Sequence, residues 1–217
     1  MKILETVLFR RPRILDLLHR IHVVRPTSQT IEAELELLER HARGAHIALE
    51  IGSYQGVSAV RIAAAMGTGS MLYCIDPWPS PVGQINACYA IFKRHVHRAG
   101  MTGRIKVLRM NSAQIGAAVP NDLDFIFVDG DHSWQGIKTD WRLVRQKLCR
   151  GGIVCLHDSF VPPGESWRRP DSVRFFEEVI AQDSQFNIID RMHSLAVLRK
   201  TPNSEKLMTT RSCHAAE

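Results

Sequence analysis

Short apolar runs alternate with helical runs along most of this chain, and that alternation constrains its fold more than any other feature. The apolar runs span 47–51, 71–75, 105–110, 125–129 and 153–156, and helical runs span 28–43, 57–66, 85–99, 113–119 and 134–148. Strands separated by helices pair in parallel through right-handed crossovers, and helices cover both faces of the sheet. The pattern therefore predicts an α/β fold with a doubly wound, Rossmann-like, mostly parallel sheet.

The C-terminal part of the pattern is different. A helical run over 172–182 precedes two strand-like runs, 186–192 and 194–199, which are separated by a single residue and predict an antiparallel hairpin at the sheet edge. With 217 residues and 45% hydrophobic content, the chain suits one buried core. We expect an N-terminal helical segment (1–27), one domain (28–200) and a C-terminal tail (201–217).

Composition excludes several classes of protein. No apolar stretch approaches the roughly 18 residues of a membrane helix, so we expect no membrane partner. The net charge of +6 is mild, and no basic run is interleaved with aromatic residues, so we expect no nucleic-acid partner. Arginines interrupt the N-terminal leucines, which argues against a signal peptide and for a cytoplasmic protein. The cysteine spacing predicts neither a disulfide framework nor a zinc site.

In a doubly wound sheet the ligand lies beyond the carboxyl ends of the strands, so residues that follow strands are the informative ones. The first strand leads into a turn with Gly52 and Gly56, where the backbone can approach a ligand closely, although an ordinary strand-to-helix turn has the same composition. Asp76 follows the second strand, where a carboxylate commonly accepts hydrogen bonds from a ribose but can also cap the strand end.

Acidic and imidazole groups gather after the fourth and fifth strands. Asp129, Asp131 and His132 follow one strand, and His157 and Asp158 follow the next. Carboxylates on neighbouring strand ends repel one another unless a cation or protons lie between them. A divalent metal ion is the natural solution, and an acidic cluster satisfied by helix N-termini and lysines is the alternative.

Together these motifs resemble the class I S-adenosylmethionine-dependent O-methyltransferases, in particular their metal-dependent, catechol O-methyltransferase-like branch. The run 49–61 is similar to the glycine motif of that branch, and the spacing from Asp129 to the pair His157 and Asp158 is similar to that of its metal-binding carboxylates. The string from Asp129 to Asp158 resembles a bacterial subgroup that acts in sugar, polysaccharide and natural-product pathways. The resemblance covers about 28–200.

The resemblance implies a role for each matching residue. The methionine part of S-adenosylmethionine would lie against Glu50, Gly52, Tyr54, Gly56 and Ser58. Asp76 would accept the ribose hydroxyls, and the adenine would lie beside Asn111 and Ser112, a pair that can equally begin a helix. The metal ligands would be Asp129, His157 and Asp158, and the catalytic base would be His132, with His157 as the alternative base.

Four positions depart from the catechol enzymes. Those enzymes have Asp-Asn where this chain has His157 and Asp158, a lysine base where it has His132, and an adenine-stacking tryptophan where it has Asp131. An oxygen-rich site favours Mg²⁺, whereas a histidine ligand shifts the preference toward Mn²⁺.

We therefore expect an enzyme that transfers a methyl group from S-adenosylmethionine to a hydroxyl oxygen of a sugar or saccharide, with Mg²⁺ or Mn²⁺. The alternatives are O-methylation of a small phenol or catechol and, in a different class, a non-catalytic nucleotide-binding domain or an NAD-dependent oxidoreductase. The G-x-G-x-x-G spacing of the oxidoreductases is missing. A homodimer would give the N-terminal helices a partner, but the sequence determines neither the oligomeric state nor the acceptor.

Overall fold

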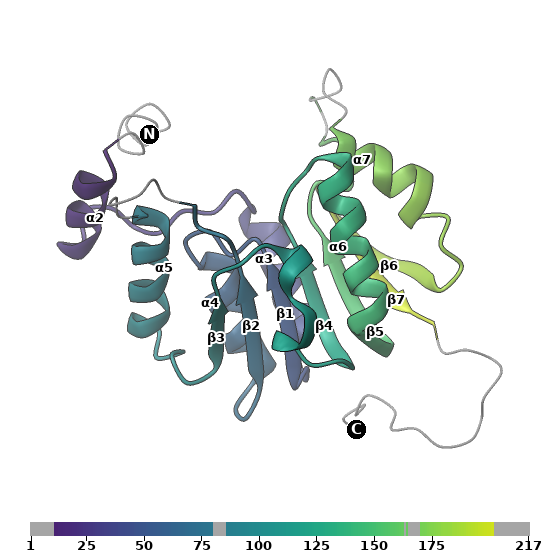
Figure 1. Ribbon diagram of the computed structural model, residues 1–217, viewed down its shortest axis with the longest axis horizontal. Helices are drawn as coiled ribbons and strands as arrows, with labels where there is room; N and C mark the ends of the chain where they lie inside the picture. The colour runs from purple at the N-terminus through teal and green to yellow at the C-terminus, as the bar shows by residue number, and fades with distance from the viewer. Residues whose placement is uncertain (1–10, 80–85, 163, 165–169, 202–217) are drawn as a thin grey trace.

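The centre of the computed structural model is a seven-stranded sheet, and the structure describes residues 11–79, 86–162, 164 and 170–201 (Figure 1). The strands are β1 (Ile47–Ile51), β2 (Met71–Ile75), β3 (Ile105–Leu108), β4 (Leu123–Val128), β5 (Leu148–Leu156), β6 (Phe186–Met192) and β7 (Leu195–Lys200). They lie in the order β3-β2-β1-β4-β5-β7-β6. Strands β1 to β5 are parallel, and β7 is antiparallel to both β5 and β6. The predicted sheet with its antiparallel hairpin is confirmed.

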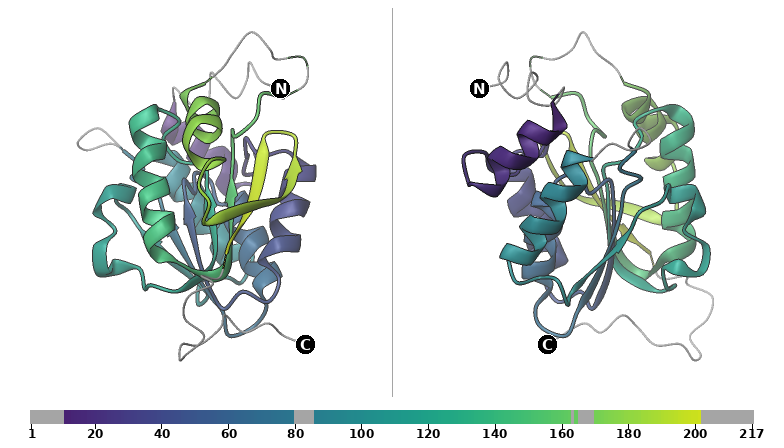
Figure 2. Two further views of the ribbon diagram at one scale, coloured as in Figure 1. Left: turned by 90° about the vertical axis from the view of Figure 1, so that its right-hand side faces the viewer. Right: turned by 60° about the vertical axis from the view of Figure 1, so that its left-hand side comes forward.

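Helices cover both faces of this sheet, as the two views of Figure 2 show. The described helices are α2 (Pro12–Arg20), α3 (Glu32–Ala42), α4 (Val57–Met66), α5 (Ala87–Arg98), α6 (Trp134–Lys147) and α7 (Asp171–Phe175). One core lies under α3, α4 and α5, and the other lies under α6 and α7.

Strand residues alternate between these two cores. In β4, Phe125 and Phe127 pack on the side of α3 and α4, whereas Ile126 and Val128 pack on the side of α6. All four are buried. This arrangement explains why the strands read as continuous apolar runs in the sequence, because neither face of a doubly covered sheet meets water.

Several predicted bounds differ from the observed ones. The helix expected over 28–43 starts only at Glu32, because the Glu34 carboxylate accepts a hydrogen bond from the Ile31 backbone N–H and caps the helix there. The turn expected over 113–119 is two 3₁₀ turns, η1 (Ser112–Gln114) and η2 (Gly116–Ala118). The helix expected over 172–182 is α7 followed by the π-helix η3 (Phe176–Ile180).

Helix α2 belongs to the segment that precedes the predicted domain, and it packs against α5 rather than against the sheet (Figure 1). Leu15 is buried against Ala87 and Ile91. Asp16 is also buried and pairs with Arg94 of α5. This contact leaves the opposite side of α2 exposed to solvent.

Two remaining predictions concern cysteines and membranes. Cys74, Cys88 and Cys155 are free thiols, as expected, but Cys149 is disulfide-bonded, which the cysteine spacing did not predict. Within the described ranges, no helix is long and apolar enough to cross a membrane.

Candidate active site

A cavity of about 410 Å³ opens at the carboxyl ends of β1, β2 and β4, where the strand order reverses. This is the switch point at which doubly wound sheets bind ligands. The predicted site residues that line it are Gly52, Tyr54, Gly56, Ser58, Asp76, Asn111, Ser112, Asp129 and His132. Glu50, His157 and Asp158 lie outside the lining.

The turn after β1 has no room for side chains at its two glycines. Gly52 has a φ of +89°, and a Cβ there would lie 1.9 Å from the Asp129 carbonyl oxygen. Gly56 has a φ of +82°, and its Cβ would lie 2.8 Å from the Phe92 ring. Both glycines are thus required by the left-handed backbone and by close packing.

Glu50 ends β1 and is fully buried beside this turn. One of its carboxylate oxygens accepts a hydrogen bond from Ser58 Oγ at 2.6 Å, and the other has no hydrogen-bond partner. Burial raises the pKa of Glu50 to about 7. A buried carboxyl oxygen with unused hydrogen-bonding capacity is a candidate for contact with a polar or cationic ligand.

Asp76 is held in place by two backbone donors. Its Oδ2 accepts from the Tyr54 N–H at 2.9 Å, and its Oδ1 accepts from the Trp78 N–H at 2.7 Å. Trp78 is itself buried and donates from Nε1 to the Tyr54 carbonyl. Each Asp76 oxygen retains a second acceptor position, so capping the strand end and accepting from a ligand are compatible roles.

At the other end of the cavity, the structure adds Asp140 of α6, which sequence reasoning missed. Asp140 lines the cavity with Asn111 and Ser112, and its side chain is buried with no hydrogen-bond partner for Oδ1. Burial raises the pKa of its carboxyl group to about 6. The signal was present in the sequence, since this carboxylate lies on the same helical stripe as the buried residues Ile137 and Trp141.

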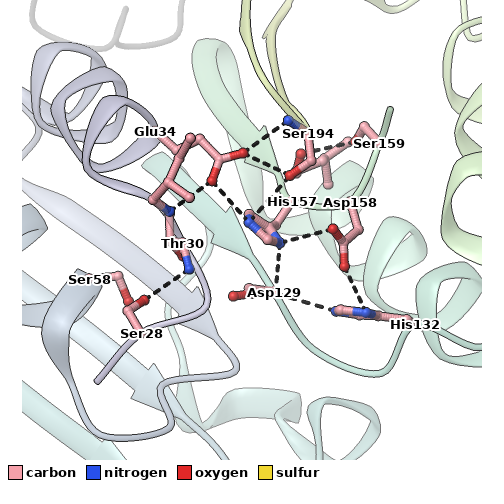
Figure 3. A network of polar contacts seen from close by, with 12 residues as sticks. Ser28, Thr30, Glu34, Ser58, Asp129, His132, His157, Asp158, Ser159 and Ser194 are labelled. Atoms are coloured by element: carbon pink, nitrogen blue, oxygen red, sulfur yellow. Dashed lines mark hydrogen bonds and ion pairs between the residues drawn. The ribbon is translucent and has the colours of Figure 1, made fainter. Parts of the chain in front are cut away.

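The predicted cluster of acids and imidazoles does form (Figure 3). His132 lies between two carboxylates, with Nδ1 2.9 Å from Asp158 Oδ2 and Nε2 3.3 Å from Asp129 Oδ1. His157 Nδ1 lies 3.3 Å from Asp129 Oδ1 and 3.4 Å from Asp158 Oδ1. Asp158 has a left-handed backbone, with a φ of +50°, a conformation that non-glycine residues adopt mainly where the surrounding structure enforces it.

The network has a fifth member that the sequence did not suggest, Glu34 of α3. Its carboxylate is fully buried and lies 3.3 Å from His157 Nε2, through Oε2. Its Oε1 accepts from both the backbone N–H and the hydroxyl of Ser194, at 3.0 and 2.7 Å. Glu34 therefore fixes the ring of His157 from the side opposite Asp129 and Asp158 (Figure 3).

These contacts determine which groups hold protons. Hydrogen bonds to Asp129 and Asp158 raise the pKa of His132 to about 10. Burial by itself would lower the pKa of His157, but contacts with Asp129, Asp158 and Glu34 outweigh it and raise that pKa to about 12. With these pKa values both imidazoles are protonated at neutral pH, and neither keeps the ordinary imidazole pKa near 6.5.

Two imidazolium ions, His132 and His157, thus lie among the three carboxylates of Asp129, Asp158 and Glu34. Protons on the imidazoles therefore reduce the repulsion between the carboxylates that the sequence predicted. Among the described residues, no group of three or more histidine, cysteine, aspartate or glutamate side chains is arranged to hold a metal ion. The candidate ligands Asp129, His157 and Asp158 contact one another instead. One donor atom is poorly satisfied, however: His157 Nδ1 is buried and has no well-aligned hydrogen bond.

Solved structures share this fold. A protein from Corynebacterium glutamicum is 19% identical, with a TM-score of 0.65 over 91% of each chain. An O-methyltransferase from Bacillus cereus, in complex with S-adenosylhomocysteine (SAH), is 17% identical, with a TM-score of 0.62 over 89% of this chain and 90% of that one. The O-methyltransferase TomG from Streptomyces achromogenes, in complex with S-adenosylmethionine, is 16% identical, with a TM-score of 0.63 over 88% and 89%.

A protein-family comparison bears on the activity. Residues 49–159, which are more than half of the chain, match a family described as a methyltransferase domain. This region contains the glycine turn, Asp76, the cavity-lining residue Ser112 and the cluster from Asp129 to Asp158. The chain therefore belongs to the methyltransferase domain family and is an enzyme of that kind.

Proposed function

We propose that this enzyme transfers a methyl group from S-adenosylmethionine to a hydroxyl oxygen, and that residues 28–200 form the catalytic domain. The observation that carries the proposal is a single cavity that joins two sets of residues. The glycine turn and Asp76 lie at one part of its lining, and Asp129 with His132 lies at another. A methyl donor bound along the first set would have its reactive end beside the second.

The cofactor residues are proposed from the fit of the cavity. Gly52 lets the turn that lines the cavity pack directly against the Asp129 backbone, because any Cβ there would clash with the Asp129 carbonyl oxygen. Asp76 has acceptor capacity for ribose hydroxyls, and the unpartnered oxygen of Glu50 could accept from a polar group of the methionine moiety. The B. cereus and S. achromogenes neighbours, which bind SAH and S-adenosylmethionine, support this assignment. When bound, S-adenosylmethionine supplies a methyl group activated by its sulfonium charge.

The remaining chemistry is assigned to the acid–imidazole network. Methyl transfer requires the acceptor oxygen to be aligned with the donor and to lose its proton. The His132 side chain is 37% exposed, compared with 7% for His157, so it is the imidazole that an acceptor can reach. We assign to His132 the handling of the acceptor proton after its ring has lost its own proton, since an imidazolium with a pKa of about 10 cannot accept one, and to Asp129 and Asp158 the orientation of that ring.

A divalent cation is a second candidate component. The observation that favours it is His157 Nδ1, which is buried without an aligned hydrogen bond and faces the carboxylates of Asp129 and Asp158. Glu34 contacts the other ring nitrogen of His157, Nε2, and a carboxylate in that position is the usual partner of a metal-ligating histidine. Asp129, His157 and Asp158 are not arranged to hold an ion in this structure; they would hold one after His157 loses its proton, and the ion would supply Lewis acidity toward the acceptor hydroxyl.

The proposed acceptor is a saccharide, and a small phenolic natural product is the alternative. The saccharide proposal rests on the resemblance of the strand-end motifs to a subgroup of sugar and polysaccharide enzymes. Trp167, Arg168 and Arg169, whose aromatic ring and guanidinium donors would suit a polar glycan, lie outside the described residues. The natural-product alternative is favoured by the structural neighbour TomG, which is involved in tomaymycin synthesis.

Two measurements test the proposal. Calorimetry should detect binding of SAH but not of NAD; the reverse result would favour an oxidoreductase. Transfer of labelled methyl from S-adenosylmethionine should then occur onto a member of a panel of mono- and oligosaccharides and phenols. Parallel reactions with excess EDTA, with Mg²⁺ and with Mn²⁺ distinguish the two versions of the mechanism: unchanged turnover in EDTA would eliminate the metal.

A further inference from the structure

The outer side of α2 exposes an apolar stripe that nothing in the described structure covers. Ile14, Leu17 and Ile21 recur at helical spacing and are 41%, 56% and 58% exposed, and Val23, in the turn that follows, is 66% exposed. The inner side of the helix packs on α5 through Leu15. Helix α2 lies on the outside of α5, away from the sheet (Figures 1 and 2), and the stripe belongs to the part of α2 that does not pack on α5.

The surroundings of this stripe are basic. The exposed cationic side chains are Arg11, Arg13, Arg20 and Arg25 on and around α2, and Lys93 and Arg98 on α5. Across 11–31 and 86–101, Asp16 is the one carboxylate, and it is buried and shared between Arg20 and Arg94. We call this set, the four apolar residues and the six exposed cations, the α2–α5 surface.

We propose that the α2–α5 surface docks the protein on an anionic membrane surface. An interfacial helix inserts an apolar stripe among the acyl chains while flanking lysines and arginines contact anionic headgroups. The four apolar residues of the α2–α5 surface suit the acyl chains, and its six exposed cations suit the anionic headgroups. Peripheral docking needs no membrane-spanning helix, and none is found among the described residues; it departs from the expectation of no membrane partner, which rested only on the missing spanning stretch.

Other occupants fit the surface less well. A second copy would form a two-fold contact that places the same patch against itself, so the arginines of one copy would lie against the basic patch of the other, and the patch has no exposed carboxylate within 11–31 or 86–101 to pair with them. A nucleic acid would match the charge but would leave Leu17 and Ile21 with little apolar surface to bury against, because its contacts are largely to phosphates. A membrane interface satisfies both the charge and the stripe.

The test is flotation of the full-length chain with vesicles of phosphatidylcholine alone or with phosphatidylglycerol added. Wild type should bind the anionic vesicles at least about tenfold more tightly than the neutral ones. The double variant Leu17→Ser/Ile21→Ser should lose roughly tenfold or more, and Arg13→Gln/Arg25→Gln a similar factor. No methyl donor is needed, so the outcome is independent of the proposed reaction.

Matched controls on other faces make the test specific. Ile188→Ser/Ile189→Ser changes two residues of β6 that are 47% and 40% exposed, and Lys138→Gln/Arg142→Gln changes exposed cations of α6. Both should bind anionic vesicles as wild type does, and thermal unfolding should verify that every variant folds.

Three results would overturn the proposal. The first is vesicle binding that survives Leu17→Ser/Ile21→Ser, since adsorption would then be purely electrostatic. The second is a dimer in sedimentation that this variant dissociates, with no vesicle binding by wild type. The third is binding of duplex or single-stranded RNA without binding of vesicles.

Discussion

Replacing Glu34 should destabilise the protein far more than its position on a solvent-facing helix suggests. Its carboxylate is fully buried and accepts from the Ile31 N–H, the Ser194 N–H and the Ser194 hydroxyl, besides pairing with His157. Glu34→Ala would leave a buried imidazolium without one partner and two Ser194 donors unpaired. Removal of one partner from a buried ion pair costs about 3 to 5 kcal/mol.

That cost converts to a thermal shift. For a chain of this size, 1 kcal/mol corresponds to about 2 to 4 °C, so Glu34→Ala should lower Tm by roughly 6 to 20 °C. The assay is calorimetric or circular-dichroism melting at pH 7. Glu36→Ala is the matched control, because Glu36 is exposed on the same helix and should change stability by about 0.5 kcal/mol or less.

The pH dependence supplies an independent check. Burial would raise the pKa of Glu34, but hydrogen bonds with His157 and Ser194 outweigh it and lower that pKa from 4.5 to about 2. A depressed acid pKa stabilises the fold fully above pH 4.5, and that contribution is lost as pH falls toward 2. The difference in stability between wild type and Glu34→Gln should therefore shrink over this interval. A Glu34→Ala protein within 1 kcal/mol of wild type at pH 7 would refute the reasoning.

The other predictions concern the cavity. Gly52→Ala should abolish binding of SAH, since its Cβ would lie 1.9 Å from the Asp129 carbonyl oxygen, whereas Gly103→Ala has open space and should bind normally in the same calorimetric assay. Asp76→Ala should weaken SAH roughly 10- to 100-fold by loss of charge-assisted hydrogen bonds; unchanged affinity would remove it from the site. His132→Ala should bind SAH normally while turnover falls at least about 100-fold, and a variant retaining a tenth of wild-type turnover would mean that the base lies elsewhere.

Local patterns in the sequence were sufficient for most of the fold. The alternation of short apolar runs with helices determined the order of elements, because strand and helix periodicities are properties of neighbouring residues. The turn glycines were also readable, since Gly52 and Gly56 follow a strand and precede a helix. The pair Asp129 and His132 is only three residues apart, so their proximity followed from the turn itself.

Tertiary structure decided what depends on residues far apart in the chain. Glu34 contacts His157 across 123 positions, and no local pattern relates the start of α3 to the end of β5. The packing of α2 on α5 through Asp16 and Arg94, 78 positions apart, selects which side of α2 remains exposed. The pKa of His132 likewise depends on Asp158 from the neighbouring strand as well as on Asp129. Sequence periodicity reports which residues are apolar, but burial and charge pairing are set by the partners that the fold brings within a few ångströms, and those partners determine the proton positions in this site.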